Sequence, residues 1–182
     1  MLEIRDIRIE NLKFGCVTDH TAPEVCFSLH SDIPGTFLQD ATIRIGDRAI
    51  PCGKEQVGIP LDGIQWKPFT NYDIEICAVD SHGQQVKGTA SFLTGRMGLP
   101  WEAKWITDRT YRIGKKVSPV PMTFRKDFSV RKPLKRAYIT ATAMGVYELM
   151  LNGEKVGDEY FAPGFTSYKK NLQYQYYDDR LS

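Results

Sequence analysis

The sequence has few histidines and cysteines and no long hydrophobic run. Its 182 residues include three His and four Cys, and no segment approaches the roughly 18–20 apolar residues of a membrane helix. No Cys-x-x-Cys pair is present and no two histidines have the spacing of metal ligands, so we expect neither a metal nor a cofactor. A net charge of +2 gives no reason to expect nucleic acid or an acidic membrane as a partner.

The N-terminus also lacks the apolar segment of a secretion signal. This absence predicts a cytoplasmic protein, although a processed secreted form would have the same appearance. Cysteines that form no disulfide would agree with a cytoplasmic location, because disulfides are rare there. Cys26 and Cys77 fall on strands where immunoglobulin domains place a disulfide, but both are out of step with the apolar residues of their strands. We therefore expect both thiols to point outward, unbridged.

Helical periodicity is missing as well, and short alternating segments take its place. In the first half, apolar and polar residues alternate over residues 7–9, 25–29, 41–45, 74–78 and 90–92. Turn residues separate these segments at regular intervals. The pattern predicts an all-β sandwich.

The second half contains its own strand and turn signals. Alternation over residues 137–144 and 146–151 predicts two strands, with a bulge or bend at Gly145. Asn152 and Gly153 tolerate positive φ and predict a type I′ hairpin. Residues 124–128 predict a further strand, and residues 162–166 an ordered loop.

Composition changes near residue 97. Residues 1–97 carry nine Lys/Arg and thirteen Asp/Glu, whereas residues 98–182 carry fifteen and nine. Seven of the aromatic residues lie in the first part and fourteen in the second. Together with the Gly- and Pro-containing stretch around residues 95–100, this shift predicts two domains, 1–97 and 98–182.

One stretch of the first domain resembles a fibronectin type III domain. The shared pattern is an apolar residue, Pro, Thr and Tyr at alternate positions, followed by alternating apolar residues. It is formed by Trp66, Pro68, Thr70, Tyr72, Ile74, Ile76 and Ala78. The resemblance implies that Tyr72 is a tyrosine-corner residue, whose hydroxyl bonds to the backbone upstream. Nothing in this domain indicates a catalytic residue.

Five phrases, in order, resemble the N-terminal region of bacterial α-L-rhamnosidases. They are Phe-x-Thr-Gly at 92–95, Trp-x-Ala-x-Trp-Ile at 101–106, Phe-Arg-Lys-x-Phe at 124–128, Gly-Val-Tyr-Glu-Leu-x-Leu-Asn-Gly at 145–153 and Ala-Pro-Gly-x-Thr-x-Tyr at 162–168. Residues 174–178 fit the aromatic strand that follows. The resemblance covers essentially the whole chain.

The resemblance implies a large glycoside hydrolase that removes terminal α-L-rhamnose with inversion, using two carboxylic residues in an (α/α)6 barrel. The chain has no run of long amphipathic helices, so we expect it to lack that barrel and to contain no catalytic residue. Its expected partner is the catalytic domain of the parent enzyme. Residues 98–182 are expected to form only part of a jelly-roll-like β-sandwich, because about eight strands are needed. The open strand edges would then favour self-association.

A different interpretation is a freestanding carbohydrate-binding module that takes rhamnose-containing glycans. Its candidate sugar-stacking residues are Trp101, Trp105, Tyr160 and Tyr168. For the two tryptophans we favour a wedge between domains, because large aromatic side chains bury the most area. Tyr147 shares a strand face with Leu149 and Leu151 and is interpreted as core.

Overall fold

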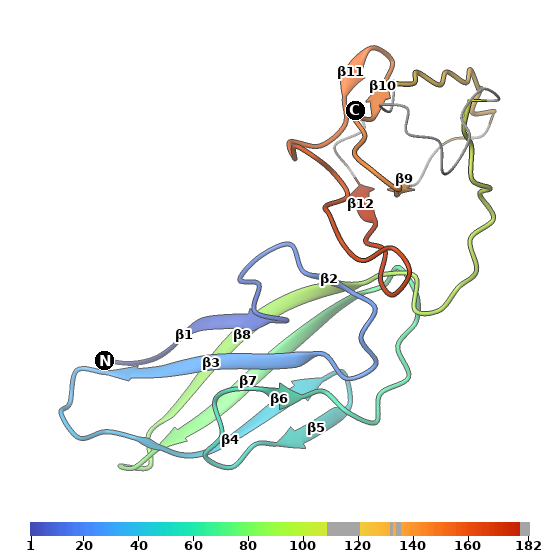
Figure 1. Cartoon of the computed structure of the whole chain (residues 1–182). Helices are drawn as coiled ribbons and strands as arrows, with labels where there is room; N and C mark the ends of the chain where they lie inside the picture. The colour runs from blue at the N-terminus through green and yellow to red at the C-terminus, as the bar shows by residue number, and fades with distance from the viewer. Residues whose placement is uncertain (109–120, 132, 134–135, 179–182) are drawn as a thin grey trace. The chain divides into compact units, whose positions relative to one another are not determined.

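The computed structural model describes residues 1–108, 121–131, 133 and 136–178. The chain divides into two compact units, Met1–Pro100 and Trp101–Ser182 (Figure 1). Every regular element among the described residues is a β-strand, which confirms the all-β prediction. None of these residues belongs to a helix of membrane-spanning length and hydropathy. The boundary at residue 97 and the fibronectin and jelly-roll assignments stay predictions.

Unit 1 is built from two sheets. Its strands are β1 (Leu2–Ile9), β2 (Val17–Thr18), β3 (Glu24–Ser31), β4 (Leu38–Ile45), β5 (Arg48–Pro51), β6 (Ile59–Pro60), β7 (Asn71–Asp80) and β8 (Gln85–Thr94). One sheet has the order β1-β3-β6 and the other β2-β8-β7-β4-β5 (Figure 1). All pairs are antiparallel except β2 with β8.

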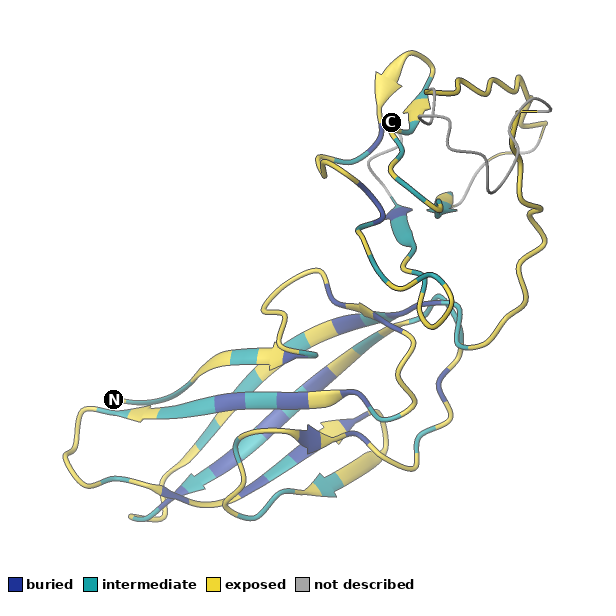
Figure 2. Ribbon diagram, in the orientation of Figure 1, coloured by how far each residue is buried: buried dark blue, intermediate teal, exposed yellow. Residues whose placement is uncertain are grey.

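Strand β7 shows why the alternating sequence gives this core. Ile74, Ile76 and Ala78 are almost completely buried, whereas Asp73 and Glu75 lie on the opposite, solvent-facing side. Figure 2 shows buried and less buried residues alternating along the long strands of unit 1. Successive side chains of a strand point to opposite faces, so period-two alternation divides them between core and solvent. The core joins buried residues from both sheets, among them Val25, Phe27, Ala41, Ile43 and Phe92.

Strand β1 departs from simple alternation. Its pairing with β3 shifts by one residue between Arg5 and Arg8, and Asp6 in the bulge has a φ of 48°. The bulge allows Ile4 and Ile7 to share a face. A Cβ atom placed on Gly88 of β8 would lie 2.9 Å from the Ile7 side chain and 3.0 Å from that of Ile4. Glycine at this position therefore allows the two sheets to approach closely.

Tyr72 makes the backbone contact that the sequence predicts. Its hydroxyl oxygen accepts a hydrogen bond from the Lys67 N–H at 2.9 Å, five residues upstream. Trp66 packs edge-on against the rings of Tyr72 and Phe92, at centroid distances of 4.8 and 5.4 Å. Its indole Nε1–H donates to the Thr21 carbonyl at 2.9 Å. This aromatic cluster attaches the segment before β7 to the core.

The four cysteines are all free, and they differ in their surroundings. Cys26 Sγ accepts the Gly58 N–H at 3.3 Å, and the Cys77 thiol donates to Glu75 Oε1 at 3.3 Å. Cys16 is buried, and burial is the main cause that raises its pKa from 9.0 to about 11, with the Glu10 carboxylate adding to the effect. Cys16 is therefore a protonated core thiol at neutral pH.

The raised pKa of Cys16 predicts a loss of stability at alkaline pH. The pKa is higher in the folded than in the unfolded chain, so the contribution is complete below about pH 9 and is lost as the pH rises toward 11. We expect the melting temperature to fall less steeply over this range in Cys16→Ala than in the unchanged protein, by calorimetry. Equal slopes in the two proteins would contradict the prediction.

Unit 2 contains four short strands among its described residues. They are β9 (Tyr138–Ala141), β10 (Met150–Leu151), β11 (Glu154–Lys155) and β12 (Gln175–Asp178). β12 pairs antiparallel with β9, and β10 pairs with β11. Asn152 and Gly153 connect β10 to β11 with φ of 52° and 90°, as a type I′ turn requires. The predicted hairpin is confirmed.

Two strand predictions for unit 2 are wrong in extent or in kind. Residues 124–128 form no strand, and Phe124 and Phe128 are exposed. The strand predicted over residues 137–144 ends at Ala141, and before β10 the next segment makes only an isolated bridge between Tyr147 and Ala162. Alternation specifies which way side chains point, but a strand also needs a neighbour for its backbone hydrogen bonds.

Candidate functional site

The aromatic residues proposed for sugar stacking have separate surroundings in unit 2. Trp101 packs edge-on against Tyr174 at a centroid distance of 5.7 Å, and Tyr168 contacts Phe165 at 5.9 Å. Trp105 lies in an irregular segment with 62% of its surface exposed. These contacts do not by themselves assemble a common platform.

Tyr160 is the most exposed of the four candidates, at 78%. The Lys155 ammonium lies 4.0 Å from its ring centroid and also donates to the Glu159 carbonyl at 3.0 Å. A cation over an aromatic ring is attracted by the ring quadrupole and occupies that face of the ring. The sugar-binding role of Tyr160 and the other three residues stays a prediction, as does the tryptophan wedge.

Tyr147 and Tyr177 form the polar centre of unit 2. Their hydroxyl oxygens lie 3.0 Å apart, and Tyr177 is 8% exposed. Burial, as the largest cause, raises the pKa of both phenols, so both stay protonated at neutral pH. Tyr147 is half-buried, on the same side as Leu149 and Leu151, while the residues between them are exposed. Because Tyr147 is half-buried and is not one of the buried residues of unit 2, its interpretation as core stays a prediction.

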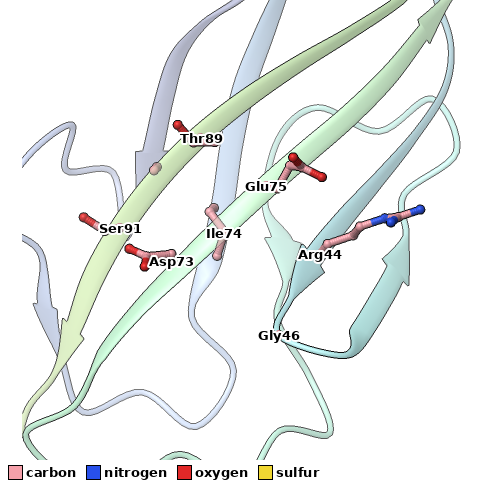
Figure 3. A pocket seen from close by; sticks show the side chains of 8 residues that line it. Arg44, Gly46, Asp73, Ile74, Glu75, Thr89 and Ser91 are labelled. Carbon is pink, nitrogen blue, oxygen red and sulfur yellow. The ribbon is translucent and has the colours of Figure 1, made fainter.

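A hollow of about 670 Å³ lies on the outer face of the five-stranded sheet of unit 1 (Figure 3). Its lining residues come from β4, the turn after it, β7 and β8: Arg44, Gly46, Asp73, Ile74, Glu75, Thr89, Ala90 and Ser91. The strand register explains the grouping. Asp73 stands opposite Ser91, and Glu75 stands between Thr89 on one side and Arg44 on the other.

The charged groups around this hollow are only partly paired with each other. The Lys87 ammonium donates to both carboxylate oxygens of Glu75 at 3.1 Å. This hydrogen bond is the main cause that lowers the pKa of Glu75, and Arg44 contributes through its charge. The carboxylate of Asp73 accepts a hydrogen bond of 3.3 Å from the Asn71 side-chain amide. The hollow therefore places carboxylate, hydroxyl and guanidinium side chains together.

The sequence did not single out the residues of this hollow. In the sequence, the charged and hydroxyl residues of the hollow occupy the polar positions of three alternating strands. Every half-exposed sheet has such polar positions, so they do not indicate a site. Only the register, which places Arg44, Glu75 and Thr89 in one row, brings them together. Within residues 1–108, 121–131, 133 and 136–178, no three His, Cys, Asp or Glu side chains gather as a metal site would require.

Sequence comparison relates the chain to one group of proteins. Residues 132–179 match the family model described as alpha-L-rhamnosidase N-terminal domain. An alpha-L-rhamnosidase of Streptomyces avermitilis is 45% identical over 67 residues, 35% of this chain and 6% of that protein. One from Formosa agariphila is 33% identical over 142 residues, 66% of this chain and 15% of the relative. The chain thus spans only a small part of these relatives.

Solved structures extend the similarity to nearly the whole chain. The alpha-L-rhamnosidase from Dictyoglumus thermophilum matches with a TM-score of 0.79 and 25% identity, over 96% of this chain and 23% of that one. The enzyme from Aspergillus terreus, at 20% identity, shares the fold with a TM-score of 0.75 over 98% of this chain and 22% of that one. Residues 132–179 therefore match the alpha-L-rhamnosidase N-terminal domain, and the chain as a whole is similar to the N-terminal region of proteins of that family.

Proposed function

We propose that this chain is the non-catalytic N-terminal part of an α-L-rhamnosidase, and that it braces or docks against a catalytic domain outside this chain. The observation that carries the proposal is the match of residues 132–179 to the N-terminal domain of these enzymes. The small share of each relative that the chain spans supports it, because most of such a protein lies elsewhere. The activity itself belongs to the proposed parent enzyme.

The surface of unit 2 fits a docking role. Several large apolar side chains are exposed in the chain by itself: Trp105, Ile106, Phe124, Phe128, Phe161 and Phe165. Phe165 is 94% exposed. Contiguous apolar patches mark surfaces that another protein covers, and we propose that these side chains contribute to such a patch. We propose the catalytic domain as the covering partner.

A chimera tests the bracing role. In the Streptomyces avermitilis relative, the segment that corresponds to this chain is replaced by residues 1–182, and a second variant lacks the segment altogether. We expect the chimera to release nitrophenol from an aryl α-L-rhamnoside and the deleted variant to lose activity or solubility. This chain alone should release none. Hydrolysis by the isolated chain, or full activity and solubility of the deleted variant, would contradict the proposal.

We further propose that the isolated chain self-associates and that it is cytoplasmic. The support for self-association is the small sheet of unit 2, in which β9 and β12 pair with each other and with no third strand among the described residues. Two-stranded sheets are marginal in water, and open edges accept further strands. Light scattering after size-exclusion chromatography should find dimers or larger species. A monomer at high concentration would exclude the self-association.

The proposed cytoplasmic location is tested by cell fractionation. Recovery of the protein outside the cytoplasmic fraction would contradict it.

A further inference from the structure

The hollow on the outer face of unit 1 has the chemistry of a ligand site. We propose that it binds a sugar: a neutral, polyhydroxylated ring held by hydrogen bonds from β4, β7 and β8. The inference does not depend on the proposed docking function, because it concerns the other unit and a different kind of ligand. It also differs from the aromatic residues of unit 2 that the sequence suggested.

The dimensions of the hollow suit a small glycan. Its volume of about 670 Å³ lies within the ~300–1,000 Å³ range of small-molecule sites. Neighbouring strands are ~4.8 Å apart, so three strands present a polar surface roughly 10 Å wide. Gly46, in the turn after β4, has no side chain to fill the space beside Arg44 (Figure 3).

The side chains supply partners for both kinds of hydrogen bond that a sugar hydroxyl makes, the one it donates and the one it accepts. A hydroxyl donates one proton and accepts through its oxygen, so its site needs acceptors and donors side by side. Asp73 offers carboxylate oxygens next to the Ser91 hydroxyl, in directly opposed positions of β7 and β8. In Figure 3 these two side chains lie close together, and Arg44 extends from β4 on the other side of Glu75.

The balance of charge argues against other ligand classes. One guanidinium and two carboxylates line the hollow, and Lys87 pairs with one of those carboxylates. A phosphate or nucleic acid needs a clear excess of positive charge, which is missing here. A hard cation needs several converging oxygens, and the described residues contain no such acidic group. An uncharged ligand with many hydroxyls meets neither objection.

No aromatic ring lines the hollow, so there is no stacking surface and we expect millimolar affinity. The test is a titration of the ¹⁵N-labelled full chain with L-rhamnose and, separately, D-glucose, followed through its amide NMR signals. Saturable shifts are expected for residues 73–75 and 89–91. Asp73→Asn should weaken binding about tenfold, because it removes a charged hydrogen-bond acceptor while keeping its shape. Ser91→Ala should weaken it less.

Two matched variants separate binding at the hollow from binding at the aromatic residues of unit 2. Trp105→Ala and Tyr160→Ala remove exposed aromatic rings there, and we expect neither to change the affinity. All four altered side chains face solvent, so melting temperatures should stay close to that of the unchanged chain. Saturable shifts confined to unit 2, shifts that Asp73→Asn does not affect, or no saturable shift with either sugar would overturn the proposal.

Discussion

Replacing Trp66 with alanine is expected to lower the free energy of unfolding of unit 1 by about 3–5 kcal/mol, the usual cost of removing a large buried aromatic side chain. Trp66 is 9% exposed and contacts Tyr72 and Phe92 edge-on. The substitution also removes the indole donor from the Thr21 carbonyl. Because the Trp66 ring packs against residues of both β7 and β8, the cavity left by alanine has few ways to collapse.

Urea denaturation followed by far-UV circular dichroism measures this effect. Trp105→Ala is the matched control, since it removes the same side chain from an exposed position and should shift the midpoint little. Tyr72→Phe removes only the hydroxyl that accepts the Lys67 N–H and should cost about 1 kcal/mol. If Trp66→Ala destabilised the chain no more than Trp105→Ala, the cluster would not support unit 1.

Replacing Gly157 with alanine is expected to destabilise unit 2 by about 2–4 kcal/mol, through a strained backbone and an overpacked contact. Gly157 has a φ of +78°, where side chains other than hydrogen are strained. A Cβ atom there would lie 2.5 Å from Cε1 of Tyr177 and 2.5 Å from Oε2 of Glu159. The Glu159 side chain can rotate away, but the buried Tyr177 ring is held by its hydroxyl contact with Tyr147.

Gly153→Ala separates the two causes. Gly153 also has positive φ, at 90°, but a Cβ atom there would meet nothing within 4 Å. We expect Gly153→Ala to lower the free energy of unfolding by only about 1 kcal/mol, the cost of backbone strain at positive φ. Amide hydrogen exchange of β9 and β12, read by mass spectrometry, should accelerate much more in Gly157→Ala than in Gly153→Ala. Equal acceleration would mean that packing against Tyr177 contributes nothing.

The local sequence pattern was sufficient to predict features that depend on a single segment. The alternation of β7 set its buried face, and Asn152 and Gly153 set the hairpin, because each depends only on backbone geometry within a few residues. The hydroxyl contact of Tyr72 followed from a motif whose two partners are five residues apart. The strand predicted for residues 124–128 did not form, because a strand needs a neighbour for its backbone hydrogen bonds and the segment itself does not specify that neighbour.

The sequence by itself determined that this protein is all-β, that it resembles the N-terminal region of α-L-rhamnosidases, and which face of each core strand is apolar. The tertiary structure alone decided which polar residues meet. Arg44, Glu75 and Thr89 are distant in sequence and become neighbours only through the register of β4, β7 and β8. The need for glycine at position 157 likewise arises from a tyrosine ring twenty residues later. Periodicity is a property of one segment, whereas a site is a property of several segments held together by packing.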